Sequence, residues 1–581
     1  MPLRYLLWLL LILSPCFSFA EVQRDTISDK IYPKNYFHSP LKIPLRIISN
    51  FGAFRDNHFH SGLDLSTQGK TGLQVIASAD GYISRIKIQS GGYGKVLYIT
   101  HPNGFVTVYA HLKRFVPKIE EWIEKIQYKA QVYELDIHPD PKELPVLQGE
   151  WIAFSGNTGN SGGPHLHFEI RDEKTEDIIN PLAFGLPITD HKPPIIKAVV
   201  IYRQDINPVS HVNGMDFMAP TFKKISIIPV RFLSGSYRLI KPLILHTGEF
   251  YYLGLISGDY SDVSASEGNP YRIELRDENT LAYSSTLLRF GFDQTRSINS
   301  FLDYSSFKFE HQKIERSYID PGNPLKIYYP ATVSDKIIQK NEGNRQFEYR
   351  VEDIFGNLAK LPLPIRFTHF IGNRGWSGQK GSDIDTGIFY NISSSLQGKN
   401  YSLKFFPNSL FENLFTHIIS INDFNLLVGN PNIPIKDSLL LSWKIPAGWK
   451  DKLAKIYISR GHTALDTWKE GDSVNTWIKE FATYTLNLDT IPPYLGWGLL
   501  KNGASVKSGQ EMTILMGDRE SGLKNYNAYL DDAWILMEYD AKSHHGFIQT
   551  PTNLTPGKHA LKIKLTDKSG NILEEKLFIY F

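Results

Sequence analysis

Cysteine is almost absent from this chain, since Cys16 is the only one among 581 residues. A single cysteine cannot form an intramolecular disulfide, and it excludes a cysteine-rich metal site. An excess of charge is lacking too, because 63 Lys and Arg residues balance 60 Asp and Glu residues to a net charge of +3. A sequence-independent nucleic-acid binder carries a strong basic excess, so we expect no nucleic acid among the partners.

Long apolar runs are also lacking. A short apolar run at residues 6–13 precedes the small residues Ser18 and Ala20. It is too short to span a bilayer, and this layout is typical of a secretory signal peptide that is cut after residue 20. We therefore predict export to the periplasm or out of the cell, with no transmembrane segment left in the mature chain. A lipoprotein signal that modifies Cys16 is the alternative, but a proline stands before it where a small residue is expected.

Turn-forming and aromatic residues are what the sequence has in abundance: 44 Gly, 33 Pro and 13% aromatics. This mixture favours β-structure with many turns. Short β-type runs separated by glycine-rich turns are predicted at residues 75–77, 81–86, 95–99 and 105–109. One helix is predicted over residues 119–130, where apolar residues recur at helical spacing.

Three short stretches carry side chains that bind metals. They are H-S-G-L-D at residues 60–64, Y-A-H-L at 109–112 and G-P-H-L-H-F-E at 163–169. Side chains alternate along an extended chain, so His60 shares a face with Asp64, and His165 with His167. Two imidazoles and a carboxylate suit catalytic Zn²⁺, which keeps a fourth position for water.

The middle stretch follows the same rule of alternation. We expect Tyr109 and His111 on one face of a strand, opposite the apolar residues Val108, Ala110 and Leu112. Imidazole titrates near neutral pH, so a histidine outside the ligand set can take a proton from water and pass it to a leaving amine. A second, protonated histidine can stabilise the charge that develops on a tetrahedral intermediate.

Together these stretches resemble the signature of the M23 (LytM- or lysostaphin-like) zinc metallopeptidases, namely H-x-x-x-D, a lone histidine in Y-A-H-L, and G-x-H-x-H. Flanking residues agree with it, at positions 50–52, 77–81, 91–94 and 156–159. The resemblance covers residues 45–185 and implies that His60, Asp64 and His167 bind one Zn²⁺. It also implies that His111 and His165 are the catalytic pair, without deciding which of them acts as the base.

The function implied by this resemblance is that of an exported zinc metalloendopeptidase. Such an enzyme hydrolyses peptide bonds in bacterial peptidoglycan, with a zinc-bound water that attacks the scissile carbonyl and two histidines that assist. Two alternatives stay open. The chain could be a non-catalytic LytM-type regulator of another cell-wall hydrolase, or a zinc peptidase that acts on protein.

Beyond residue 193 the pattern changes to alternating strands. A weak repeat links residues 348–357 with 561–571, each a strand that runs into Asp and Gly-Asn, and double prolines at 193–194 and 492–493 mark two domain starts. We predict a mainly β protein: an antiparallel β-sheet peptidase domain followed by immunoglobulin-like or related β-sandwich modules. These modules would contact an envelope protein partner or position the enzyme.

The predicted divisions follow from these changes of pattern. An insert at about 113–148 interrupts the peptidase domain, and we expect it beside the groove, where it would narrow what can enter. The divisions are a signal peptide (1–20), an N-terminal extension (21–40), the peptidase domain (41–188), an immunoglobulin-like domain with insertions (189–370), a β-rich domain (371–486) and a C-terminal immunoglobulin-like domain (487–581).

Overall fold

The computed structural model describes residues 32–581, except 206–209, 213–214, 218–220, 263–265, 279, 330–340 and 370–385. The predicted signal peptide and Cys16 lie outside the described residues. The fold is mainly β with antiparallel sheets, which confirms the predicted class. No helix in the described part of the chain is long and apolar enough to cross a membrane. Four units are distinguished below: the peptidase unit (32–188), the second unit (189–369), the third unit (386–488) and the C-terminal unit (489–581).

The peptidase unit is built on an antiparallel sheet with the strand order β1-β4-β13-β8-β7-β6-β10. The strands are β1 (Ile47–Ser49), β4 (Leu63–Ser66), β13 (His165–Asp172), β8 (Phe105–Leu112), β7 (Lys95–Thr100), β6 (Gly81–Ile88) and β10 (Leu135–Ile137). A smaller sheet joins β5 (Gln74–Ile76), β12 (Trp151–Phe154) and β9 (Arg114–Phe115), and a short hairpin joins β2 (Phe54–Arg55) to β3 (His58–Phe59). Strands β4 and β13 are neighbours, with Asp64 directly opposite His167.

One face of this sheet builds the core and the other carries the polar side chains. Leu63 and Leu65 of β4 and Leu166 and Phe168 of β13 are fully buried in the main hydrophobic cluster. Alternation therefore sends Asp64 and His167 to the opposite face.

The insert contains helix α1 (Pro117–Ala130), which confirms the predicted helix and buries Ile119 and Ile123. After it, β10 pairs with β6 at the edge of the sheet farthest from β4. The expected position beside the groove is therefore wrong for this segment. The strand completes the free edge of the sheet, and α1 contacts the C-terminal unit instead, where the Tyr128 ring lies edge-on to Trp534 with centroids 5.2 Å apart.

The expected face of Tyr109 is also wrong. Its side chain is fully buried in the main core, together with Leu112, whereas Val108 and Ala110 belong to a small cluster on the other face. The strand is irregular after Tyr109, and His111 has a left-handed backbone conformation with φ of 59°. This bulge turns the His111 side chain to the polar face and breaks the alternation on which the expectation rested.

The second unit has two large sheets that share the main hydrophobic cluster with the peptidase unit, and a hairpin of β16 (Ser210–Val212) and β17 (Met215–Phe217). One contains β19 (Ser236–Leu239), β18 (Thr221–Leu233), β15 (Ile195–Asp205), β21 (Tyr251–Gly258) and β25 (Glu315–Arg316). The other contains β20 (Leu243–His246), β28 (Leu358–Thr368), β27 (Gly343–Glu352), β22 (Arg272–Asp277), β23 (Thr280–Thr286) and β26 (Tyr328–Tyr329). Strand β24 (Arg289–Phe290) pairs with β14 (Ile178–Ile179) of the peptidase unit, so the two units interlock.

The third unit packs two five-stranded sheets around a separate core. Its sheets are formed by β30 (Ser394–Gln397), β31 (Tyr401–Phe405), β35 (Pro434–Lys444), β39 (Ser473–Glu480) and β38 (Thr467–Glu470), and by β33 (Ile418–Asn422), β34 (Asn425–Val428), β40 (Ala482–Leu488), β36 (Ile456–Arg460) and β37 (Thr463–Ala464).

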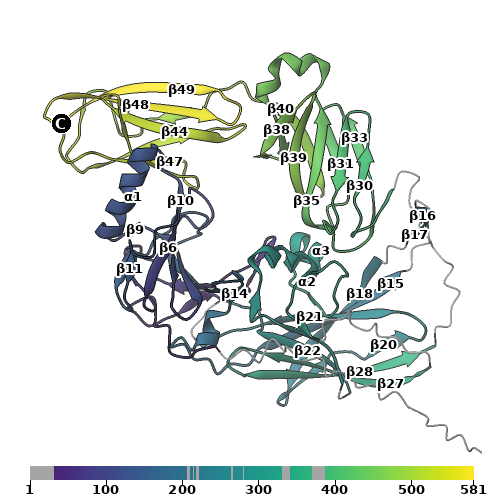
Figure 1. The fold of residues 1–581 in the computed structure, drawn as a ribbon. Coiled ribbons are helices and arrows are strands. Elements are labelled where there is room, and N and C mark those ends of the chain that lie inside the picture. Colours follow the sequence, from purple (N-terminus) through teal and green to yellow (C-terminus); the bar gives the residue numbers. More distant parts are fainter. Residues whose placement is uncertain are drawn as a thin grey trace, which may run out of the picture.

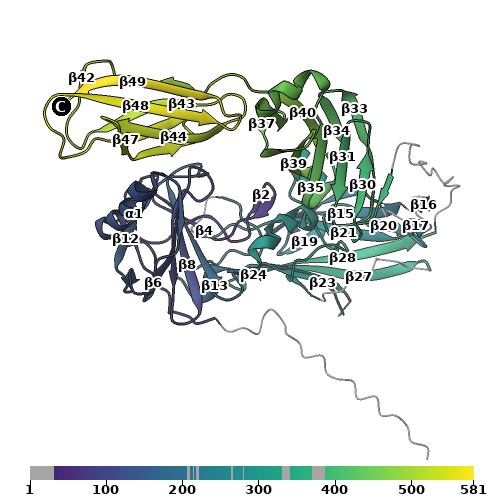
Figure 2. The same cartoon turned by 45° about the horizontal axis from the view of Figure 1, so that its top comes forward.

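The C-terminal unit has a core of its own between two sheets. They contain β41 (Tyr494–Gly496), β43 (Glu511–Gly517), β47 (His545–Gln549) and β46 (Met537–Asp540), and β42 (Ala504–Ser505), β49 (Ile572–Tyr580), β48 (Lys558–Asp567), β44 (Leu523–Leu530) and β45 (Ala533–Ile535). The chain curves round so that this unit comes to lie beside α1 (Figures 1 and 2). An ion pair of 2.7 Å between Lys95 of the peptidase unit and Glu538 of the C-terminal unit connects the first unit to the last.

Candidate metal centre

Three predicted ligands meet on the polar face of the peptidase sheet. Nε2 of His60, Oδ1 of Asp64 and Nδ1 of His167 lie 3.0 Å from one another in each of the three pairs. Ligands 2.0–2.1 Å from one tetrahedral Zn²⁺ would lie about 3.3 Å apart. The donor set and its spacing therefore fit a zinc ion.

Each imidazole is held so that its other nitrogen aims at this common point. Nδ1 of His60 lies 2.8 Å from the carbonyl oxygen of Asn50, to which it donates, and Nε2 of His167 lies 2.8 Å from Oε1 of Glu169. Such hydrogen bonds fix the tautomer and leave the facing nitrogen as the metal donor. The free oxygen of Asp64, Oδ2, accepts a hydrogen bond of 3.0 Å from Arg55.

The buried carboxylate of Glu169 is the centre of a second layer around the ligands. It is fully buried and accepts hydrogen bonds from Ser61 at 2.6 Å, Tyr93 at 2.5 Å and Arg171 at 2.6 Å. Burial alone would raise the pKa of Glu169, but the Arg171 charge and the hydrogen bond from His167 outweigh it and hold the pKa far below its ordinary value. Glu169 therefore stays ionised and orients His167.

Two ionised carboxylates, those of Asp64 and Glu169, stand at the centre. Burial would lower the pKa of His167, yet its hydrogen bonds to Asp64 and Glu169 raise that pKa to about 9. Burial would raise the pKa of Asp64, but the neighbouring His60 and the hydrogen bonds from the three histidines hold it well below its usual range. A cation is stabilised in such surroundings.

His111 and His165 stand beside the ligands, with ring centroids 4.9 Å apart. Nδ1 of His111 lies 2.8 Å from the carbonyl oxygen of Thr158, and Nδ1 of His165 lies 2.8 Å from that of Gly163. Both rings therefore carry their proton on Nδ1 when neutral, and Nε2 of His165 lies 3.3 Å from Oδ1 of Asp64. Burial and the neighbouring His167 and His165 lower the pKa of His111 to about 3, so this ring is neutral at pH 7.

Gly62 permits the close approach of the first ligand stretch to β13. A Cβ atom at this position would lie 2.3 Å from the carbonyl oxygen of Phe168. Any side chain would push the segment between His60 and Asp64 away from the sheet, so glycine is required for the ligands to converge.

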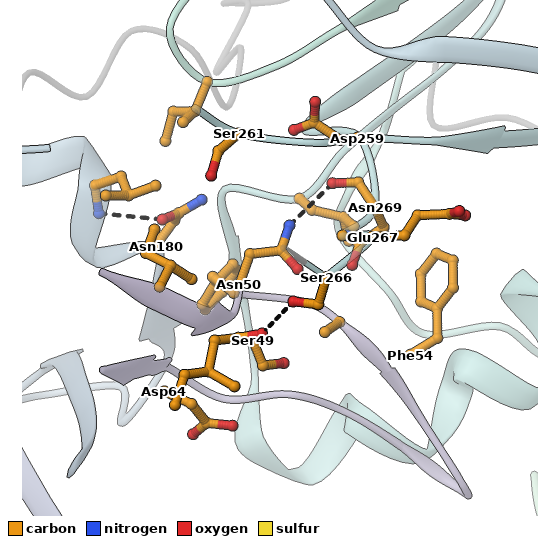
Figure 3. Close-up of a pocket in the computed structure, with 18 of the residues that line it drawn as sticks. Ser49, Asn50, Phe54, Asp64, Asn180, Asp259, Ser261, Ser266, Glu267 and Asn269 are labelled. Atoms are coloured by element: carbon orange, nitrogen blue, oxygen red, sulfur yellow. Dashed lines mark hydrogen bonds between the residues drawn. The ribbon is translucent and has the colours of Figure 1, made fainter. Parts of the chain in front are cut away.

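A cavity of about 690 Å³ opens beside the centre and is shared by two units. The peptidase unit contributes Asp64, His165 and Asn50, and the second unit contributes a wall that includes Asn269 and Asp259 (Figure 3). Asn50 donates to the backbone oxygen of Asn269 at 3.1 Å, which ties the two walls together. Oδ1 of Asn50 and Oδ1 of Asn269 are buried acceptors without a hydrogen-bond partner among the described residues.

Sequence reasoning missed the layer around Glu169 and the wall from the second unit. The signal for the first was present, because the alternation of His165 and His167 continues through Glu169 and Arg171 on the same face. For the second there was no local signal, since apart from Asp190 the wall begins at Asp259, 90 residues beyond the last ligand stretch and 195 beyond the first.

Comparison with known proteins bears on the first unit. Residues 58–136 match the model of Peptidase family M23. An uncharacterized metalloprotease of Haemophilus influenzae is 32% identical over 162 residues, which cover 27% of this chain and 28% of that protein. The DD-carboxypeptidase/endopeptidase Mpg of Neisseria meningitidis serogroup B is 37% identical over 128 residues, which cover 22% of this chain and 23% of that protein.

A further relative is named as an activator and not as a peptidase. The murein hydrolase activator NlpD of Salmonella dublin is 29% identical over 139 residues, which cover 24% of this chain and 29% of that protein. The matches thus span about a quarter of each relative and leave the other units of this chain aside. Residues 58–136 thus match the M23 family within the unit that also holds the candidate metal centre, and three further β-rich units follow it.

Proposed function

We propose that this protein is an exported zinc metalloendopeptidase that hydrolyses peptide bonds in bacterial peptidoglycan. The observation that carries the proposal is the convergence of His60, Asp64 and His167 within 3.0 Å, with His111 and His165 beside them. A protein that had kept the fold only for binding would not need all five side chains oriented in this way.

His60, Asp64 and His167 would hold the zinc ion, and His111 and His165 would form the catalytic pair. When bound, Zn²⁺ supplies a Lewis acid and lowers the pKa of water at its open position. Neutral His111 presents an unprotonated Nε2 that can accept a proton, because Nδ1 is committed to Thr158. His165 is committed to Gly163 in the same way, and its Nε2 faces Asp64, which stabilises the ring after it gains a proton.

The shared cavity would bind the peptide part of the wall. Its lining includes the polar side chains of Ser49, Arg55 and Glu267, which can form hydrogen bonds with the backbone of an extended peptide. The Neisseria relative is named a DD-carboxypeptidase/endopeptidase, which supports the hydrolysis of peptide bonds. Location in the envelope and contact of the later units with an envelope protein belong to the same proposal.

Digestion of purified sacculi tests this function. The wild type, His165→Ala and the exposed control His138→Ala are each brought to one equivalent of zinc, and the fragments are analysed by mass. We expect the wild type and His138→Ala to release peptide fragments. His165→Ala should keep its zinc, because His165 is not a ligand, and should lose at least about 100-fold in rate.

Two results would contradict the proposal. If the zinc-loaded wild type released no fragment but stimulated another wall hydrolase, the protein would be a regulator like the activator from Salmonella. If it cut protein substrates and left muropeptides intact, it would be a zinc peptidase that acts on protein.

A further inference from the structure

A second group of carboxylates lies outside the peptidase centre. Asp190 precedes the double proline that opens the second unit, Asp259 follows β21, and Asp353 stands in the turn between β27 and β28. Their carboxylate oxygens lie within 4.8 Å of one another, and Asp190 and Asp353 are buried. Three segments distant in sequence thus bring three carboxyl groups into one small space.

Hydrogen bonds inside the protein leave part of this cluster unsatisfied. Asp190 is only 6% exposed, and its Oδ2 has no hydrogen-bond partner among the described residues. Oδ1 of Asp259 and Oγ of Ser261 are likewise buried without a partner in the described part of the chain. A buried carboxylate oxygen that faces two other carboxylates and no donor is costly unless a cation satisfies it.

The C-terminal unit shows the same cluster with its oxygens satisfied. Asp489, Asp518 and Asp567 also lie within 4.8 Å of one another. Oδ2 of Asp489 accepts hydrogen bonds from the backbone N–H and the hydroxyl of Ser521, and Oδ1 accepts from Ile491 and Asn571. In the described part of the chain no carboxylate oxygen of this second cluster is buried without a partner, whereas two are in the cluster around Asp190.

We propose that Asp190, Asp259 and Asp353 bind a structural Ca²⁺ ion where the second unit joins the peptidase unit. Ca²⁺ takes oxygen ligands at 2.3–2.6 Å, so two ligands of one ion lie at most about 5 Å apart, as they do here. The donor set contains neither His nor Cys, which favours a hard cation over zinc. Ca²⁺ tolerates irregular geometry, whereas Mg²⁺ demands a near-ideal octahedron and keeps several waters.

The ion would hold together three segments that shape the cavity. Asp259 and Ser261 line the wall that faces Asp64 across the cavity (Figure 3). Asn357 connects the other two ligand segments, since its side-chain nitrogen donates to the backbone oxygen of Asp190 at 3.0 Å and to Oδ2 of Asp353 at 2.7 Å. Burial and the carboxylates of Asp353 and Asp190 raise the pKa of Asp259 to about 7, which reflects strong mutual repulsion.

The test uses the full chain, stripped of metal on a chelating resin and reloaded with one equivalent of Zn²⁺. Ca²⁺ binding is measured by equilibrium dialysis with metal analysis, and the melting temperature is recorded with and without Ca²⁺. The variants are Asp259→Asn and, as the matched control in the satisfied cluster, Asp518→Asn. We expect Asp259→Asn to bind one Ca²⁺ fewer than the wild type, and Asp518→Asn to bind as many as the wild type.

The change in melting temperature on adding Ca²⁺ distinguishes a calcium ligand from a carboxylate that only supports the fold. At a Ca²⁺ concentration 100 times the Kd, the wild type should melt about 5–10 °C higher, and Asp259→Asn should not respond. Without Ca²⁺ the variant should melt at or above the wild type, because one of three repelling charges is gone. Zinc content should stay at one equivalent throughout, which separates this proposal from the peptidase proposal.

Several results would overturn the calcium site. The proposal fails if the wild type binds no Ca²⁺ at millimolar concentration, or if Mg²⁺ stabilises it and Ca²⁺ does not. Equal Ca²⁺ binding by Asp259→Asn and the wild type would also refute it. So would a melting temperature of Asp259→Asn that is lower than wild type by the same amount with and without Ca²⁺, because the carboxylate would then serve only the apo fold. If Asp259→Asn does not fold, Asp190→Asn takes its place.

Discussion

Replacement of Glu169 by glutamine tests the layer that orients His167, a candidate metal ligand. The change keeps the shape of the side chain but removes the charge that pairs with Arg171, which is 8% exposed. Removing one partner of a buried ion pair costs about 3–5 kcal/mol of stability, because the other charge is left unpaired. His167 also loses a charged acceptor at Nε2, and loss of such a partner lowers metal affinity about 10–100-fold.

Urea unfolding of the zinc-free protein and competition for zinc with a fluorescent chelator measure these two effects separately. Glu173→Gln, an exposed change near the end of the same strand, is the control and should alter neither quantity. The pKa of Glu169 is lower in the folded protein than its ordinary value of 4.5, so its contribution is full above pH 4.5 and declines as the pH falls further. The stability difference between wild type and variant should therefore shrink on acidification. The orienting role would be refuted by a variant whose free energy of unfolding lies within about 1 kcal/mol of the wild type and whose zinc affinity lies within about twofold of it.

Three other substitutions test different parts of the fold. Burial lowers the pKa of His101 from 6.5 to about 4, so the unfolded chain binds the extra proton first and stability should fall by about 3 kcal/mol between pH 6.5 and 4. His101→Gln should flatten that slope in urea titrations. Glu538→Gln leaves the ammonium of Lys95, whose side chain is 4% exposed, without its ion pair and should cost about 1–3 kcal/mol by the same assay. In Gly156→Ala the new Cβ would lie 2.3 Å from a backbone nitrogen next to β8, whereas Gly162→Ala meets nothing within 4 Å. Thermal melting should therefore show a large loss for Gly156→Ala and little change for Gly162→Ala.

Much of the centre could be predicted from the sequence because its ligands obey local periodicity. The alternation along residues 165–169 placed His165 and His167 on one face, and the structure has that face. The centroid of the His111 ring lies 4.9 Å from that of His165 and 5.8 Å from that of His167, but the expected face of Tyr109 is wrong. The left-handed conformation of His111 depends on contacts with Tyr93 and Thr158, 18 residues before it and 47 after it, and periodicity contains no such information.

The rest depends on contacts between distant segments. The repeat that ends in Gly-Asn was visible in the sequence, and in the structure both copies are tight turns that join paired strands. Nothing local showed that Asp190 and Asp259 would meet Asp353 there, because three carboxylates gather only when the two sheets of the second unit are in place. The insert was misplaced for a related reason, since its partner Trp534 lies in the last unit of the chain.

The segment between residues 156 and 165 of the peptidase unit is in contact with the C-terminal unit. This segment supplies the acceptors that orient two histidines, the carbonyl oxygens of Thr158 for His111 and of Gly163 for His165. Lys542 of the C-terminal unit donates to two other carbonyl oxygens of the same segment, those of Asn157 and Ser161. The orientation of both histidines thus rests on a segment that is held from outside the peptidase unit. A rearrangement of the C-terminal unit would therefore reach His111 and His165 through the backbone, without any contact with His60, Asp64 or His167.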